Sequence, residues 1–354
     1  MQRTPSLREV AREAGVSAMA VSLALRDHPS IAETTRLRVR KVAARLGYRR
    51  NPLAAAFMAQ LRRGRVPKDV RTIAYLTPWK LPDDRLNHPF AWESFQAAAT
   101  HGAQLGYDIQ PVWLQEPGIS IRRLSDILYH RGITGVIVDS LPMLKIRRHL
   151  SLDWPRFAGV LIGDTIARPL LHRTAKDEFS NMLTALRALA HRGYRRVGLV
   201  LPEPTHRRVG FRLAAAYLVF HKYLRRSGHP PPFIHDSIEG ARLLQWYRRH
   251  QPDAIVTTAT YLIEKLSELG LRVPRDVAVA NLDLLAEHQG VAGIDPGCRL
   301  IAMTAVDILD LQLIQNERGI PSQARVVLIP GKWCDGATAP SKPVYGAEPP
   351  RLSA

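Results

Sequence analysis

The chain has 354 residues, 46% of them hydrophobic and 23% charged, which are ordinary proportions for a protein with two or three folded domains. Its formal net charge of +19 favours a polyanionic partner, nucleic acid before membrane lipid, although a generally basic soluble protein would show the same total. The only two cysteines are far apart, which argues against a disulfide framework and a structural zinc site.

Several absences narrow the class of protein further. The first ten residues contain no apolar segment of the kind found in signal peptides, and no run of 18 apolar residues occurs. We therefore expect a soluble cytoplasmic protein with no membrane partner. No phosphate-binding loop, no zinc-protease motif and no nucleophile elbow is present, so we expect no enzyme activity, no metal and no cofactor.

The positive charge is concentrated at the N-terminus. Up to Arg65 there are fourteen Lys and Arg against four Asp and Glu, a net charge of +10, which is more than half of the total. The part of the chain that meets a polyanion is therefore expected to lie within these residues.

A helix-turn-helix pattern lies between Ser6 and Gly47. Ser6 with Glu9 three residues later forms a capping box, which predicts the start of a helix. Gly15 can adopt the positive φ that ends this helix, and Ser17 can cap a second one. A third helix is predicted over residues 33–46. The side chains expected in the core of this headpiece are Leu7, Val10, Ala11, Ala14, Val21, Leu25, Leu37, Val39, Val42 and Leu46.

The run from Ser6 to Ala54 resembles the headpiece of the lactose/galactose repressor family. The matching pieces, in order, are EVA, AGVS, the VS pair, HPSI, TRLRV, LGY and NP. Several short motifs in one order are far more specific than a lone helix-turn-helix pattern. The resemblance implies that a helix from Ala18 to about Leu25 lies in the major groove of DNA, with the flanking helix N-termini on phosphates.

The resemblance also implies a set of DNA contacts, and this chain departs from the family pattern within it. Family members usually place polar or charged readers where this chain has Ala18, Met19 and Leu23, and such small or apolar side chains can contact thymine methyl groups but cannot make bidentate base hydrogen bonds. The DNA-binding residues that the resemblance implies are Ser6, Ser17, Ala18, Met19, Ser22, Leu23, Arg26, Thr35, Tyr48, Asn51, Leu53, Ala54 and Phe57.

A hinge and linker are expected over residues 51–71. Pro52 suits the first turn of a helix, and the alanines that follow are strong helix formers. In the family this segment is a hinge helix in the minor groove, and Phe57 stands at the apolar wedge between the central base pairs. The alternative is that Phe57 packs between two hinges or onto the core. The basic residues 62–65 either lie near phosphates or form a solvated charge run.

The remainder predicts an α/β core of two doubly wound lobes. Short β-branched or apolar runs alternate with longer helical patterns, first over residues 72–140 and again over residues 179–283. Strands separated by helices indicate parallel sheets covered on both faces, with a ligand at the carboxyl ends of the strands.

The core resembles the periplasmic-binding-protein-like core of the same family. The matching pieces include NHPF, GITGVIV, HRGYRRVGLV, RRVGFR, PDAIV, GLRVPRDVAVANLD and VLIPGKW. By this resemblance the chain crosses between the lobes near Gly163, Ile294 and Pro321. The expected domains are a headpiece over 1–50, a hinge over 51–71, an N-lobe over about 72–163 and 294–321, a C-lobe over about 164–293 and 322–338, and a disordered tail over 339–354.

Three residues are carried over from the family as effector-binding: Phe90, Arg207 and Asp283. A carboxylate, a guanidinium and an aromatic ring suit a hydroxyl-rich ligand such as a sugar or sugar derivative. Phe90 could instead belong to the core, Arg207 could be a surface charge, and Asp283 could cap a strand end. Two departures change the pocket: the family's Asn-Asp pair is Ala259-Thr260 here, and its second aspartate is Leu284.

The expected function is that of a DNA-binding transcription regulator, most simply a repressor. Its expected partners are double-stranded DNA with a pseudo-palindromic operator, a second copy of the chain in a homodimer, and a small effector. An enzyme, an exported solute-binding protein and a nonspecific DNA binder were the rival classes. A solute-binding protein would have no use for the headpiece, and the ratio of specific to random DNA affinity separates the nonspecific binder.

Overall fold

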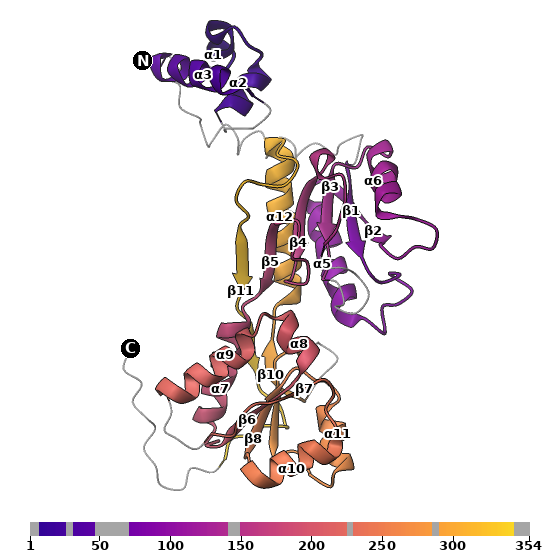
Figure 1. Cartoon of the computed structure of the whole chain (residues 1–354), viewed down its shortest axis with the longest axis vertical. Coiled ribbons are helices and arrows are strands. Elements are labelled where there is room, and N and C mark those ends of the chain that lie inside the picture. Colours follow the sequence, from indigo (N-terminus) through magenta and orange to yellow (C-terminus); the bar gives the residue numbers. More distant parts are fainter. Residues whose placement is uncertain are drawn as a thin grey trace. The chain divides into compact units, whose positions relative to one another are not determined.

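The computed structural model describes residues 7–25, 31–46, 71–140, 149–224, 229–284 and 290–342. The chain divides into two compact units, Met1–Asp69 and Val70–Ala354 (Figure 1). The hinge residues 51–70 and the end of the chain from residue 343 lie outside the described residues.

The described residues of the first unit form three helices that contact one another: α1 (Leu7–Ala14), α2 (Ala18–Ala24) and α3 (Glu33–Leu46). These bounds agree with the predicted second and third helices. Gly15 has a φ of +65° and so ends α1 in the left-handed conformation that glycine favours. The core that holds the three helices together consists of Val10, Ala11, Ala14, Val21, Ala24, Val39 and Ala43.

One expected core residue of the headpiece is on the surface instead. Leu37 is 60% exposed, whereas Val39 and Ala43 are buried. Val39 and Ala43 are four residues apart and therefore share one face of α3, while Leu37 lies about 200° around the helix from Val39. The prediction that Leu37 packs inward was wrong for that reason.

The second unit holds two six-stranded sheets. The first has the order β11-β5-β4-β3-β1-β2, and all its strands are parallel. Its strands are β1 (Arg71–Thr77), β2 (Tyr107–Trp113), β3 (Gly135–Val138), β4 (Ala158–Ile162), β5 (His172–Lys176) and β11 (Val326–Ile329). Its helices are α5 (Pro89–Gln104), α6 (Ile121–His130), the 3₁₀ helix η1 (Trp154–Arg156) and α12 (Cys298–Gln315).

Helices cover both faces of this sheet, as alternate residues of its strands show. Ile73 and Tyr75 pack with α5 and α12, while Ala74 and Leu76 pack with α6. Figure 1 shows α12 lying along β4 and β5, which it contacts. The predicted doubly wound arrangement is confirmed for this lobe.

The second sheet has the order β12-β10-β9-β8-β6-β7, in which only β12 runs antiparallel to its neighbour. Its strands are β6 (Val197–Pro202), β7 (Phe233–His235), β8 (Ala254–Thr257), β9 (Ala278–Asn281), β10 (Ala292–Asp295) and β12 (Lys332–Cys334). Its helices are α7 (Glu178–His191), α8 (Glu203–Arg208), α9 (Arg212–Val219), the π-helix η2 (Phe220–Leu224), α10 (Gly240–His250) and α11 (Leu262–Glu268).

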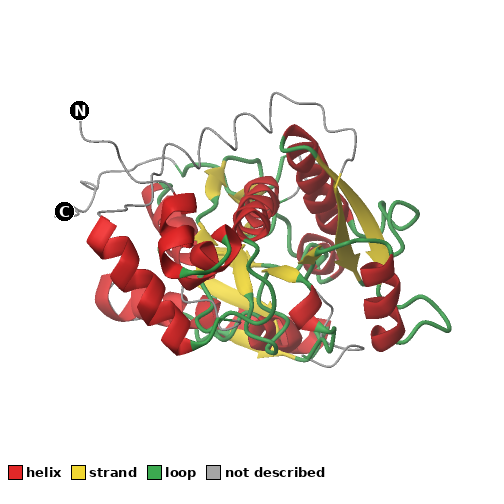
Figure 2. Ribbon diagram, turned by 90° about the horizontal axis from the view of Figure 1, so that it is seen from above, coloured by secondary structure: helices red, strands yellow, loops and turns green. Residues whose placement is uncertain are grey.

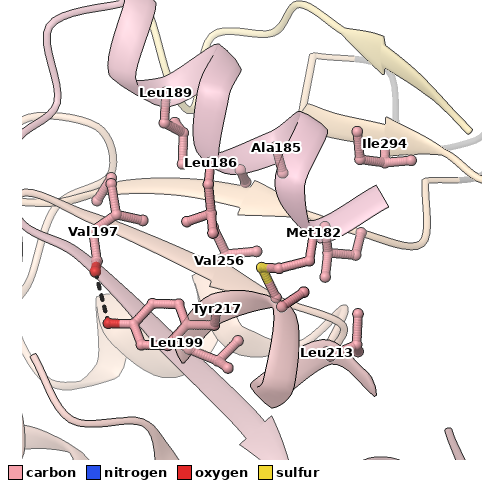
Figure 3. Packing of buried hydrophobic residues seen from close by; sticks show 14 of the residues in the cluster. Met182, Ala185, Leu186, Leu189, Val197, Leu199, Leu213, Tyr217, Val256 and Ile294 are labelled. Carbon is pink, nitrogen blue, oxygen red and sulfur yellow. Dashed lines mark hydrogen bonds between the residues drawn. The ribbon is translucent and has the colours of Figure 1, made fainter. Parts of the chain in front are cut away.

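The core of the second lobe lies mainly between this sheet and helices α7 and α9. Met182 and Leu186 of α7 and Tyr217 of α9 are fully buried against the sheet (Figure 3). The hydroxyl of Tyr217 donates a hydrogen bond of 2.9 Å to the carbonyl oxygen of Val197, so its one polar group is satisfied inside the core. Helices α10 and α11 pack on the opposite face of this sheet. Figure 2, a view from above, shows strands with helices around them.

The first crossing between the lobes follows β5 and lies after Lys176, not near Gly163 as expected. The segment after Gly163 returns as β5, which pairs with β4 and so extends the first sheet. Lys176 therefore ends the first sheet and the next residues begin α7 of the second lobe. This later crossing places Lys176 at the boundary between the lobes.

The other two crossings join the lobes at the same boundary. The second follows Asp295 at the end of β10, next to the expected Ile294. The third lies between β11 and β12, after Ile329 rather than near Pro321, because β11 pairs with β5 before the chain returns to the second sheet.

The ordered core also continues past the expected end at residue 338. Ala339 is 1% exposed, and the Tyr194 hydroxyl donates a 2.7 Å hydrogen bond to the Pro340 carbonyl. Lys342 Nζ lies 2.9 Å from Asp253. The disordered tail was expected to begin at residue 339, but residues 339–342 belong to the ordered core.

Candidate functional site

A pocket of about 480 Å³ lies where the carboxyl ends of strands from both sheets meet. Trp79 follows β1, Asp139 follows β3 and Asp164 follows β4, whereas Asp283 follows β9 of the other lobe. Parallel α/β sheets place loops rich in functional groups at this edge, and the volume suits a small-molecule ligand.

Lys176 and Asp283 join the two lobes inside this pocket. Lys176 Nζ lies 2.5 Å from Asp283 Oδ1, and the two side chains are 22% and 11% exposed. Asp283 is itself oriented, because its backbone N–H donates to Asn281 Oδ1 at 2.8 Å. Burial alone would lower the pKa of Lys176, but the neighbouring carboxyl groups of Asp283 and Glu178 and the thiol of Cys298 outweigh it and raise that pKa.

Aromatic rings line the side of the pocket that belongs to the first lobe. Phe90, in the first turn of α5, lies with its ring centre 4.9 Å from Lys176 Nζ. Trp79 stacks on His88 with ring centres 3.4 Å apart and planes 15° from parallel. Burial lowers the pKa of His88, which favours the neutral ring in this stack, and nearby Asp84 only partly opposes it. Phe90 and Asp283 thus line one pocket, which agrees with the positions that the family resemblance implied.

Two carboxyl groups in the pocket are buried enough to hold a proton near neutral pH. Burial raises the pKa of Glu178, at the start of α7, to about 7, and Asp283 adds to this effect while Lys176 and Arg208 oppose it. Burial likewise raises the pKa of Asp139 to about 7, against the opposing hydrogen bond of 2.7 Å from the Ser140 N–H.

Asp139 also borders an unsatisfied hydroxyl. Tyr75, fully buried on β1, lies beside it, and burial and the Asp139 carboxyl group raise the pKa of Tyr75 well above its ordinary value. Neither Tyr75 Oη nor Asp139 Oδ2 has a hydrogen-bond partner within the part of the chain that the structure describes. Asp139 lines the pocket, so its free carboxyl oxygen can take part in a hydrogen bond with a polar ligand atom.

The structure places Arg208, not Arg207, in the pocket. Both residues end the short helix α8, and successive helical side chains point about 100° apart. Arg207 turns outward: its side chain is 63% exposed, and its Nε lies 2.8 Å from Glu203 one turn earlier. The surface-charge alternative for Arg207 therefore agrees with the structure, and its expected place in the pocket does not.

Asp164, a further carboxylate that lines the pocket, interacts with two arginines. Asp164 accepts a hydrogen bond from Arg212, and Arg173 Nη1 lies 3.7 Å from it. Two family positions that depart from the usual pattern take no part: Ala259 and Leu284 are buried, at 5% and 7% exposure, and neither lines the pocket. The polar groups of this pocket therefore come from other positions.

Five of the pocket's charged residues were not singled out from the sequence: Asp139, Asp164, Lys176, Glu178 and Arg208. A usable signal exists for Asp139 and Asp164, because each closely follows an apolar run that forms a parallel strand, whereas the strand that ends at Lys176 contains no such run. Glu178 and Arg208 lie on helices beside the strand ends, and only the folded arrangement shows which side they face.

The headpiece residues expected to contact DNA are described only in part. Ser17 caps α2, since its hydroxyl accepts a 3.1 Å hydrogen bond from the Ala20 N–H, while Leu23 and Thr35 are half-buried. Ala18, Met19 and Ser22 belong to α2 by their backbone. The remaining expected contacts lie outside the described residues: Ser6, Arg26, Tyr48, Asn51, Leu53, Ala54 and Phe57.

Comparison with known families identifies both units. Residues 6–51 match the model of bacterial regulatory proteins of the lacI family, and residues 186–339 match that of the periplasmic binding protein-like domain. The sucrose operon repressor of Escherichia coli is 25% identical over 301 residues, which cover 79% of this chain and 84% of that protein. The regulator MalR of Streptococcus pneumoniae is 21% identical over 326 residues, covering 88% and 90%.

Solved structures share the fold of the whole chain. A lac repressor dimer bound to operator and the anti-inducer ONPF has a TM-score of 0.54 at 17% identity and covers 95% of this chain and 99% of its own. The transcriptional regulator CelR in complex with cellobiose has a TM-score of 0.56 at 18% identity and covers 94% and 99%. Among the residues that the structure describes, no helix is long and apolar enough to span a membrane, and no cluster of metal-ligating side chains occurs.

Proposed function

Because this chain is, by its two domain matches, a lacI-family regulatory protein with a periplasmic-binding-protein-like core, we propose that it is a transcription repressor controlled by a small hydroxyl-bearing effector. The observation that carries the proposal is the pocket between the lobes, where Asp283 of one lobe and Phe90 of the other face the same space. A carboxylate that accepts hydroxyl hydrogen bonds beside an aromatic ring is a usual way to bind a sugar.

The pocket also supports a means of control. Lys176 and Asp283 come from different lobes, and a ligand that competes for Asp283 or bridges it changes the contact between them. A ligand can shift the balance between two arrangements of the lobes only by binding one of them better. We infer that the effector acts in this way on the operator-binding form of the protein.

Two finer points belong to the same proposal. The repressor acts as a homodimer on a pseudo-palindromic operator, with one headpiece on each half-site. Exposed apolar side chains at Leu218, Val219 and Tyr223 give the core one surface that a second copy can cover. The protein has no catalytic role in this proposal, in keeping with relatives that are named as regulators.

The first step of the test is to find a DNA sequence that the full chain prefers. Operators are selected from a random library, and affinities for the selected and a scrambled duplex are measured by fluorescence anisotropy at one salt concentration. A repressor should prefer its operator by about 10³-fold or more. Mono- and disaccharides are then added to the operator complex. Equal affinity for both duplexes would identify a nonspecific DNA binder, and no response to any small molecule would remove the effector from the proposal.

A further inference from the structure

We infer that the effector carries an acidic group, a carboxylate or a phosphate, which Arg208 binds in the pocket. This inference rests on the proposed function, because it names the chemical class of ligand for the same pocket. It follows from the charged side chains around Glu178 and from how they are paired.

Arg208 is the cation in this pocket that lacks a partner of its own. It is half-buried and lines the pocket, yet it makes no ion pair or hydrogen bond within the residues that the structure describes. Its neighbour Arg207 is ion-paired with Glu203 on the outer surface. A half-buried guanidinium has lost part of its hydration, so a carboxylate or phosphate that reaches it gains charge-assisted hydrogen bonds.

Lys176 in the pocket, and Arg212 and Arg173 behind its lining residue Asp164, already have carboxylates. Lys176 is paired with Asp283, and Arg212 and Arg173 share Asp164. The positive charge of Arg208 lowers the pKa of Glu178. Lys176 and Arg212 also lower this pKa, whereas Asp283 raises it. Arg208 and Glu178 form no ion pair among the described residues, although Arg208 lowers the pKa of Glu178.

Glu178 is a poor partner for this purpose. It is 7% exposed, and burial favours its protonated form, so at neutral pH it neutralises Arg208 only in part. Asp139, the other carboxyl group with a pKa of about 7, lies beside Tyr75 on the first lobe. Arg208 therefore keeps a positive charge that an acidic group of the ligand would balance.

The remaining lining fits the rest of such a ligand. Asp283 can accept hydrogen bonds from hydroxyl groups, and Phe90 and Trp79 can cover an apolar ring face. A ligand acid group that competes for Lys176 would also free Asp283 for those hydroxyls. The class that combines these features is an acidic sugar derivative: a uronate, an aldonate or a sugar phosphate.

The experiment measures binding of matched probes to the full chain by isothermal titration calorimetry at constant ionic strength. The probes are glucose and galactose, their uronates and aldonates, their 6-phosphates, and inorganic phosphate alone. Charge-assisted hydrogen bonds should make one acidic derivative bind at least about tenfold more tightly than its neutral parent. Comparing the affinities of the uronates and aldonates with those of the sugar phosphates then shows whether the preferred acid group is a carboxylate or a phosphate.

Two variants assign the preference to Arg208. In Arg208→Gln the ratio of acid to neutral affinity should fall towards one, while Arg207→Gln, one residue away on the outer surface, should keep the wild-type ratio. Glu178→Gln removes the competing carboxyl group and should strengthen acid binding at pH 8, which tests the same site if Arg208→Gln fails to fold.

Several results would overturn the inference. They are a neutral parent that binds as tightly as its acid, an equal loss for both in Arg208→Gln, inorganic phosphate that matches the sugar phosphate, and no binding by any probe. A neutral sugar that binds and alters operator affinity would reject the acidic class but keep the proposed function. Equal affinity of the wild-type protein for the operator and for the scrambled duplex would instead reject the proposed function itself.

Discussion

Lys176, the last residue of the first sheet's β5, reaches across the lobe boundary to within 2.5 Å of Asp283, which follows β9 of the second sheet. This ion pair is largely withdrawn from water, so each charge depends on the other. It stands in the space where the resemblance to the repressor family places an effector's hydroxyl groups. An effector that binds Asp283, as proposed above, must therefore share this carboxylate with Lys176 or displace Lys176 from it.

Replacing Lys176 by Met should destabilise the core by about 3 kcal/mol, because it leaves the carboxylate of Asp283 buried without its partner. Urea unfolding of the full chain measures the loss. Adding Asp283→Leu should restore much of the stability, since two apolar side chains then replace the pair.

The matched control is Lys265→Met, which breaks an ion pair of the same 2.5 Å length with Glu268 on the surface. An exposed pair contributes at most about 1 kcal/mol, so this variant should unfold close to the wild type. Equal effects of the two substitutions would show that Lys176 and Asp283 do not depend on each other.

Asp283→Ala should abolish the response of operator binding to the effector while leaving operator affinity within about threefold of the wild type, because the headpiece has its own core. Anisotropy titrations with and without effector measure both quantities. Asp276→Ala, which removes a half-buried carboxylate that is paired with Arg272 and does not line the pocket, is the control and should respond normally. A normal response in Asp283→Ala would show that Asp283 does not bind the effector, and loss of folding would make it a structural residue.

The sequence predicted the α3 bounds, the alternation of strands and helices, and the presence of Phe90 and Asp283 in one pocket. The helix bounds and the alternation depend on periodicity, which is local in the chain, whereas the places of Phe90 and Asp283 were implied by the family resemblance. The resemblance then supplied which strand ends meet.

What the sequence could not show depends on rotation about a helix or on strand pairing. Arg207 and Arg208 are adjacent and identical, and only the direction of each side chain from α8 separates a surface charge from a pocket residue. Leu37 fitted a helical pattern but faces away from the core. The first crossing was placed too early because nothing in residues 172–176 reveals that they pair with β4.

The stability of the core should fall as pH rises from 5 to 8. Burial raises the pKa of Asp139 to about 7, against about 3.9 for an unfolded aspartate. The folded protein therefore holds a proton that the unfolded chain releases, so this stability is fully present below about pH 4 and is lost as pH rises through about 7. Asp139 accounts for about 2 to 3 kcal/mol of the loss, and Glu178 acts in the same direction.

Melting temperatures at pH 5 and pH 8 check this assignment. Asp139→Asn cannot ionise, so it should lose less stability over this range than the wild type. Asp108→Asn, on an exposed position of β2, should lose as much as the wild type. The same pH dependence in Asp139→Asn and in the wild type would remove Asp139 as its source.

Ser17→Ala should weaken operator binding several-fold. Its hydroxyl caps α2, and loss of such a cap costs about 1 kcal/mol of helix stability. Ser120→Ala is a matched control, because Ser120 caps α6 of the core in the same way, accepting from the Arg123 N–H at 3.2 Å. Anisotropy should show weaker operator binding for Ser17→Ala and none of this effect for Ser120→Ala. Equal operator affinities in both variants would show that the Ser17 cap on α2 does not contribute to DNA recognition.

Phe57→Ala should weaken operator binding strongly and leave binding to random DNA nearly intact. Phe57 lies outside the described residues, and the prediction follows from the position that it shares with the family's minor-groove wedge. The apolar positions Ala18, Met19 and Leu23 offer few hydrogen bonds to bases, so discrimination must come largely from DNA deformation at the operator centre. Unstacking a central step costs a few kcal/mol, which the contacts of the hinge with the bent groove offset. Binding to random DNA depends on phosphates and does not need the wedge. Anisotropy on operator and random duplexes at one salt concentration measures both, and equal losses would mean that Phe57 packs against protein rather than entering the groove.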